Sequence, residues 1–96
     1  MKKTIRWDPK KSSWLKRNLE RGGVSFEECA MLIAEGRILD SITNPSANHS
    51  DQNVFVLEIN GYVYLVPYVE NDAEIFLKTL YPSRKFTALY LNGITK

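Results

Sequence analysis

The sequence has little of what metal and redox chemistry need, because its 96 residues include one cysteine, Cys29, and one histidine, His49. A single thiol cannot form an internal disulfide, and no two candidate metal ligands stand at an i, i+4 spacing with a third nearby. Cys29 falls on the apolar stripe of a predicted helix, which favours a buried structural thiol. His49 stands in a polar stretch, where a solvated imidazole is the simplest interpretation. We expect no metal and no cofactor.

Long hydrophobic runs are also missing. No run approaches the roughly 20 apolar residues of a membrane-spanning helix, and the first residues, MKKTIRWDPKK, lack the apolar stretch of a secretory signal peptide. Glycine-rich phosphate loops are absent, since neither Gly22-Gly23 nor Asn60-Gly61 has the required spacing. A chain of this length supports one hydrophobic core. We expect a single cytoplasmic domain over residues 1–96 with no membrane partner.

Net charge is small, at +2, but it is unevenly distributed. Residues 2–21 carry eight basic side chains against Asp8 and Glu20, whereas residues 27–74 are mostly acidic. The basic residues are Lys2, Lys3, Arg6, Lys10, Lys11, Lys16, Arg17 and Arg21. The N-terminal segment is therefore a basic face that could attract phosphate by releasing counterions.

Two helices are predicted in the first third of the chain. Asp8-Pro9 is a helix-start signal for a helix over Pro9–Arg21, which Gly22-Gly23 ends. Ser25 and Glu28 form a capping box that starts a second helix, in which Phe26, Cys29, Ala30, Leu32 and Ile33 form the apolar stripe. Gly36 supplies the left-handed residue that ends it.

Strands are predicted in the remainder. Arg37–Thr43 alternates weakly, Asn44–Gln52 is a polar loop, and Val54–Ile59 and Tyr62–Val69 form a hairpin around Asn60-Gly61. Pro67 has no N–H to donate to a neighbouring strand, so it should lie at a bulge or where the N–H side of its strand is unpaired.

Glu74–Tyr81 follows as a last strand, whose alternation places Ile75, Leu77 and Thr79 on one face and Phe76, Lys78 and Leu80 on the other. Pro82-Ser83 begins a short C-terminal helix. The expected fold is α+β, with two N-terminal helices packed on a three- to four-stranded antiparallel sheet.

Basic and aromatic residues around the sheet remain for chemistry: Tyr62, Tyr64, Tyr68, Lys78, Tyr81, Arg84 and Lys85. Cleaving RNA through its own 2′-hydroxyl needs a proton acceptor, cations that stabilise charge at phosphorus, and an acid for the leaving oxygen. Lys78 could instead extend along a sheet margin, Arg84 could pair with a surface carboxylate, and two of the three tyrosines at 62, 64 and 68 could serve packing alone.

The order of these signals resembles a known family. Trp-Asp-Pro-Lys at Trp7–Lys10, Gly-Val-Ser-Phe-Glu-Glu at Gly23–Glu28 and a sheet ending in Ser-Arg-Lys at Ser83–Lys85 are similar to the BrnT-like toxins of bacterial type II toxin-antitoxin systems, within the RelE superfamily. The resemblance implies a RelE-like fold and an endoribonuclease (a hydrolase) that cleaves mRNA, free or on the ribosome. It implies a cognate antitoxin from an adjacent gene and operator DNA bound only through that antitoxin. Arg84 and Lys85 match the family's basic helix start.

Two hypotheses follow. The first is a metal-independent endoribonuclease in which Lys78, Arg84 and Tyr62 are catalytic. Its RNA-binding residues are Lys16, Arg17, Tyr64 and Lys85. The second is a non-catalytic corepressor or RNA-binding module of the same fold, favoured by the weak net charge. A mobile-element protein with an unrelated partner is a third interpretation.

Overall fold

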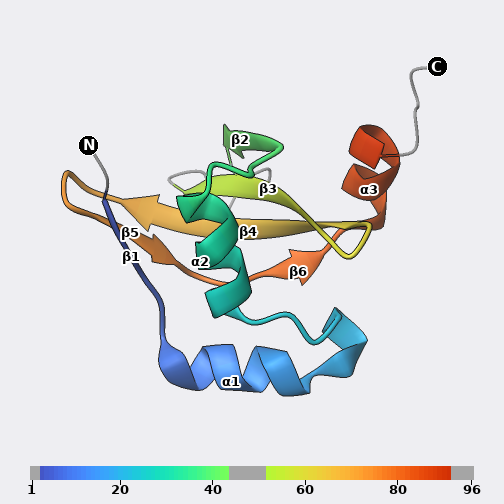
Figure 1. The fold of residues 1–96 in the computed structure, drawn as a ribbon, viewed down its shortest axis with the longest axis horizontal. Helices are drawn as coiled ribbons and strands as arrows, with labels where there is room; N and C mark the ends of the chain where they lie inside the picture. The colour runs from blue at the N-terminus through green and yellow to red at the C-terminus, as the bar shows by residue number, and fades with distance from the viewer. Residues whose placement is uncertain (1–2, 44–51, 92–96) are drawn as a thin grey trace.

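The computed structural model describes residues 3–43 and 52–91, which form a mixed six-stranded sheet with three α-helices (Figure 1). The helices are α1 (Pro9–Arg17), α2 (Phe26–Ala34) and α3 (Arg84–Leu91), with a 3-10 turn at Leu19–Arg21. The strands are β1 (Thr4–Arg6), β2 (Asp40–Thr43), β3 (Asn53–Ile59), β4 (Tyr62–Glu70), β5 (Glu74–Leu77) and β6 (Tyr81–Pro82). The α+β class is confirmed.

Both predicted N-terminal helix starts are confirmed. Asp8 accepts a hydrogen bond from the Lys10 backbone N–H at 2.9 Å, and Pro9 opens α1. Ser25 and Glu28 form the capping box, with the Ser25 N–H donating to Glu28 Oε1 at 2.9 Å. The prediction that the first helix runs to residue 21 is wrong, since α1 ends at Arg17 and the chain tightens into the 3-10 turn.

The hairpin is confirmed in its position and in its turn. Asn60 and Gly61 have φ angles of 55° and 80°, the positive values that a type I′ turn requires. β3 and β4 pair antiparallel from Asn53 opposite Tyr68 to Ile59 opposite Tyr62. β2 starts at Asp40 rather than at residue 37. The predicted loop at 44–52, with His49, lies outside the described residues except for Gln52.

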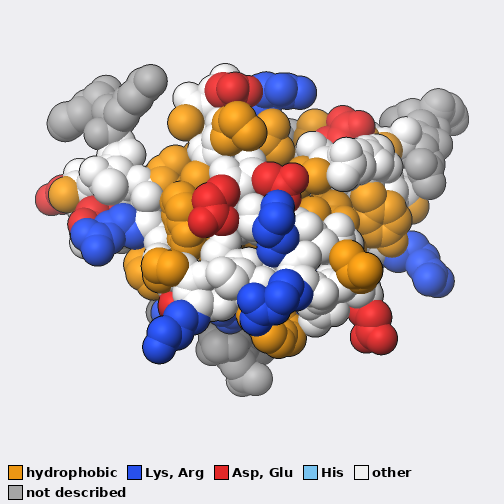
Figure 2. Space-filling view, turned by 60° about the horizontal axis from the view of Figure 1, so that its bottom comes forward, with side chains coloured by type: hydrophobic (Ala, Val, Ile, Leu, Met, Phe, Trp, Pro, Cys, Tyr) orange, Lys and Arg blue, Asp and Glu red, His pale blue; other side chains and the backbone are white. Residues whose placement is uncertain are grey.

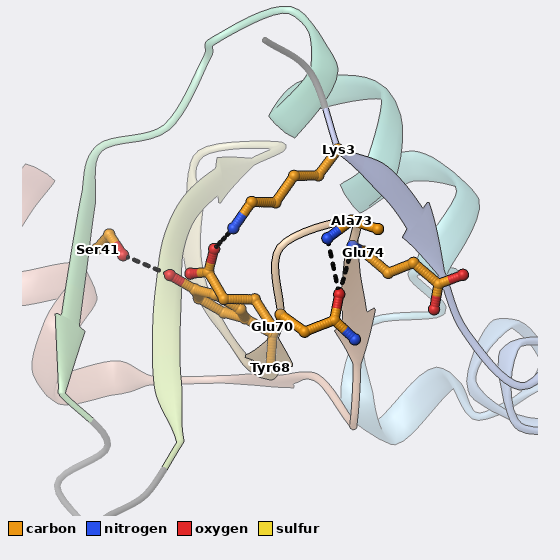
Figure 3. A network of polar contacts seen from close by, with 7 residues as sticks. Lys3, Ser41, Tyr68, Glu70, Ala73 and Glu74 are labelled. Carbon is orange, nitrogen blue, oxygen red and sulfur yellow. Dashed lines mark hydrogen bonds and ion pairs between the residues drawn. The ribbon is translucent and has the colours of Figure 1, made fainter.

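The sheet is not the expected antiparallel meander, because β1 adds to it in parallel with β5. Its register runs from Thr4 opposite Glu74 to Arg6 opposite Phe76. Figure 3 shows how this corner is held: Lys3 pairs with Glu70 at 2.5 Å, and the Asn71 side-chain oxygen accepts from the Ala73 and Glu74 N–H groups. A three-residue strand without clear alternation gave no sequence signal.

The two faces of the sheet bury different cores. Leu15 of α1 and Phe26 and Cys29 of α2 pack with sheet residues that include Phe55 and Leu57. Burial raises the pKa of the Cys29 thiol to about 12, in agreement with the predicted structural role. On the other face, Val54, Val56, Val63 and Leu65 form a smaller core that Phe86 and Tyr90 of α3 cover. None of the described helices is long and apolar enough to cross a membrane.

The predicted last strand is interrupted, and Pro67 lies at the interruption as expected. β5 ends at Leu77, the Lys78 N–H donates to the Pro67 carbonyl at 2.8 Å, and β6 resumes only at Tyr81. In an antiparallel ladder Pro67 would return a hydrogen bond to Lys78, but it has no N–H with which to do so.

The interruption is a bulge, and it reverses which face of the sheet the following side chains point to. Between the two registers, β4 contributes only Val66 while the partner segment contributes Thr79 and Leu80. One extra residue reverses the alternation. The prediction that Leu80 shares a face with Phe76 is therefore wrong, because Leu80 packs in the same core as Leu77.

Ser12 connects α1 to α2 and gives the first prediction. Its buried hydroxyl donates to Glu27 Oε1 at 2.5 Å and accepts from the Phe26 N–H at 3.0 Å. Ser12→Ala leaves that N–H buried without a partner, so we expect the free energy of unfolding to fall by about 1–3 kcal/mol in urea titrations. Ser13→Ala, one residue along α1 and exposed, should change it by less than about 0.5 kcal/mol. Equal losses would contradict the role given to Ser12.

Candidate functional site

Three basic side chains from three segments of the chain interact electrostatically: Lys11, Arg21 and Lys78. The pKa of Lys11 is lowered, first by partial burial and then by the positive charges of Arg21 and Lys78, while Asp8 acts in the opposite direction. The charges of Arg21 and Lys78 therefore both act on Lys11, which lies in the first turn of α1. We call these three residues the basic cluster.

The route of the chain explains why α1 reaches Lys78. β1 runs parallel to β5 and leads through Trp7 and Asp8 directly into α1, which continues along the same side of the sheet below β6 (Figure 1). Lys78 lies in the short segment between β5 and β6. The third residue of α1, Lys11, is thereby brought near a residue 67 positions later.

Arg21 is fixed in the basic cluster by two contacts. Its Nη2 donates to the Leu80 carbonyl at 3.1 Å, and its guanidinium lies 5.6 Å from the centre of the Trp14 ring. The second contact is a cation–π interaction of the kind that guanidinium groups form readily. The 3-10 turn places Arg21 there, and Gly22 follows with φ 92°.

Lys78 is exposed, and its Nζ lies 5.4 Å from the centre of the Phe76 ring. The ion pairs in the described part of the chain engage Lys3, Arg6 and Arg37. Within residues 3–43 and 52–91, no carboxylate lies within ion-pairing distance of the basic cluster. Its charges are therefore available to an anion.

The α1 end of the molecule carries further charge. Lys16 and Arg17, both predicted to bind RNA, are exposed in the last turn of α1. Arg17 lines a hollow of about 490 Å³ together with Trp14, Asn18, Leu19 and Glu20. Figure 2, which turns this end toward the reader, shows Lys and Arg side chains interspersed with hydrophobic ones.

The structure does not bring Arg84 and Lys85 to this site. Both are exposed at the start of α3, the helix that covers the opposite face of the sheet from α1 and α2. The Ser83 N–H donates to Val63, whereas the Lys78 N–H donates to Pro67. Four residues of strand separate the two acceptors, a distance of about 13 Å. Neither Arg84 nor Lys85 is among the charges that act on Lys11. Lys78 itself pairs with Pro67, which stands opposite Val54 of the core that α3 covers.

The two predicted tyrosines are packing residues. Tyr64 is 6% exposed in the core between the sheet and the N-terminal helices. Burial, followed by the charges of Tyr62, Glu28 and Cys29, raises its pKa, so it is a poor source or acceptor of protons at neutral pH. Tyr62 packs edge-on against Tyr64 with ring centres 6.1 Å apart.

Sequence reasoning identified Lys78 and the basic N-terminal segment but did not connect them. Lys11, Trp14 and Arg21 were not singled out, because many cations share residues 2–21 and local pattern does not show which one meets the sheet. The sequence signal that pointed to this site was Pro67, because the strand paired with a proline loses a hydrogen bond and is interrupted there.

No three His, Cys, Asp or Glu side chains in the described segments are grouped so that they could hold a metal ion. Comparison of the chain with known protein families, with curated proteins and with solved structures finds no match. The chemistry of the site therefore has to be argued from its own residues.

Gly22 gives a test of how closely the turn before the site packs on Tyr64. A Cβ on Gly22 would lie 2.0 Å from Tyr64 Oη, whereas a Cβ on Gly36 would have no neighbour within 4 Å, and both residues have positive φ. We expect Gly36→Ala to lower the free energy of unfolding by about 1–2 kcal/mol through backbone strain alone. Gly22→Ala should lower it further, because Tyr64 must also move. Thermal or urea melts that rank the two variants equally would contradict this packing.

Proposed function

We propose that this protein is an RNA-binding toxin that cleaves mRNA without a metal ion, and that the basic cluster holds the scissile phosphate. The observation that carries the proposal is that the charges of Arg21 and Lys78 act on Lys11, while no carboxylate among the described residues forms an ion pair with any of the three. Gathering like charges is unfavourable in the free protein and becomes favourable when a polyanion binds.

The three side chains can divide the steps of RNA cleavage. The neutral form of Lys11, favoured by its lowered pKa, accepts the proton of the 2′-hydroxyl as that oxygen bonds to phosphorus. Arg21 stabilises the charge that develops on the phosphoryl oxygens. The bond from phosphorus to the 5′-oxygen then breaks, and Lys78 in its ammonium form supplies the proton to the leaving oxygen. The products are a 2′,3′-cyclic phosphate and a 5′-hydroxyl.

The biological setting comes from the family resemblance. In this proposal the protein is inhibited by a cognate antitoxin encoded beside it, acts in the cytoplasm on mRNA, and meets operator DNA only through the antitoxin. Lys16 and Arg17 extend the basic surface along α1 and guide the RNA backbone to the basic cluster.

A non-catalytic RNA-binding or corepressor module is the second candidate. The observation that favours it is that Tyr64 is buried and Tyr62 packs against it, while Arg84 is not among the charges that act on Lys11. This module would use the same basic cluster to hold RNA but would leave the RNA intact.

The variant Lys78→Ala tests whether RNA binds at the basic cluster or at the start of α3. Removing one phosphate contact should reduce the slope of log K against log salt concentration by about 1 and weaken binding of an RNA oligonucleotide, measured by fluorescence anisotropy. Lys85→Ala removes the same charge from α3 and is the matched control, for which we expect affinity close to that of the unmodified protein. A larger loss for Lys85→Ala than for Lys78→Ala would move the site to α3.

The same proteins, incubated with end-labelled RNA in a chelator, distinguish the two candidates. The enzyme predicts cleavage to cyclic phosphate ends that Lys11→Ala abolishes and that becomes faster as pH rises and Lys11 loses its proton. Lys78→Ala removes both the proposed acid and a charge that lowers the pKa of Lys11, so cleavage should slow and the remaining activity should shift to higher pH. Tight binding without cleavage at any pH would support the module.

A further inference from the structure

A hollow beside the basic cluster is lined by both apolar and polar side chains. It is lined by Trp14, Arg17, Asn18, Leu19 and Glu20, at the junction of α1 and the 3-10 turn, and has a volume of about 490 Å³. Trp14 is 46% exposed and Leu19 is 81% exposed, although both are large hydrophobic residues. The hollow thus combines apolar surface with amide, carboxylate and guanidinium groups.

The hollow is continuous with the basic cluster through one pair of side chains. Arg21 lies over the Trp14 ring, and Trp14 also lines the hollow. A polymer whose phosphate meets Arg21 therefore has its neighbouring group beside Trp14. Charge complementarity favours an anionic polymer here, because Arg17 lines the hollow and Arg21 lies over the Trp14 ring, against one carboxylate, that of Glu20.

We infer that this hollow receives one unpaired nucleobase of the RNA, so that the protein selects single-stranded over double-stranded substrates. The base stacks on the Trp14 ring, which accepts any base because each has a π face. The Asn18 amide and the Glu20 carboxylate are placed to hydrogen-bond the polar edge of the base, and Arg17 contacts the flanking phosphate. In a duplex, neighbouring pairs cover the faces of each base, so only an unpaired base can enter.

This inference rests on the proposed RNA binding, and the test separates the two. Fluorescence anisotropy compares a 5′-labelled single-stranded oligouridylate with a blunt-ended RNA duplex that has the same total number of nucleotides. Stacking of one base is typically worth about tenfold or more in affinity, so we expect the single strand to bind about tenfold more tightly. Trp14→Ala should remove most of that difference while the affinity for the duplex stays nearly unchanged.

Two variants control for packing and folding. Leu89→Ala shortens an equally exposed hydrophobic side chain on α3 and should affect neither RNA. Trp14→Phe keeps an aromatic ring and should keep much of the preference for the single strand. The oligouridylate should quench tryptophan emission in the unmodified protein, but not in Trp14→Phe, where only Trp7 emits.

The outcomes distinguish the base site in the hollow from RNA binding at the basic cluster. Equal affinity for both RNAs, with Trp14→Ala indistinguishable from the unmodified protein, overturns the base site and leaves RNA binding by the basic cluster intact. No measurable binding to either RNA contradicts the proposed function as well.

Discussion

The missing N–H of Pro67 determines how the chain runs from Lys78, its partner on the neighbouring strand, to Tyr81. Lys78 can donate to Pro67 but receives nothing back, and the chain leaves the ladder for Thr79 and Leu80 before pairing resumes at Tyr81. The extra residue turns Leu80 into the core beside Leu77, and the Leu80 carbonyl accepts from Arg21. One imino acid therefore shapes the place where the sheet meets the helical segment.

The basic cluster costs stability in the free protein, and the charge of Asp8 offsets this in part without forming an ion pair with the cluster. Surface cations normally lie near carboxylates, as Lys3 lies near Glu70 and Arg6 near Glu74 at the opposite end of β5. At the β5–β6 bulge the cations instead contact aromatic rings and a carbonyl. Contacts of this kind orient a cation without neutralising it, which suits a surface that binds phosphate.

The parts of the fold that depend on neighbouring residues could be predicted from the sequence. Asp8, the Ser25–Glu28 pair and Asn60-Gly61 each act within a few residues, and the structure confirms the helix starts and the hairpin turn. The parallel pairing of β1 with β5 could not be predicted, because it joins segments about 70 residues apart through only three residues each.

The site was predictable only in part, for the same reason. Lys78 was expected inside a continuous strand over Glu74–Tyr81, whereas it follows the end of β5, and its expected partner was Arg84, six residues away along the chain. The charge of Arg84 is not among those that act on Lys11, whereas β1 leads into α1 and brings Lys11 within reach of the charge of Lys78 from the far end of the sequence. Proximity along the chain was a poor guide because the bulge and β6 lie between the two residues.

The most direct test of this account is the pKa of Lys11, measured by NMR titration of its side chain in the unmodified protein and in Lys78→Gln. The account predicts that Lys11 titrates below its ordinary value, and that removing the charge at position 78 raises its pKa. Lys85→Gln should leave the pKa of Lys11 unchanged. If Lys78→Gln and Lys85→Gln gave the same titration of Lys11 as the unmodified protein, Lys78 would not belong to a shared cluster and the proposed phosphate site would be wrong.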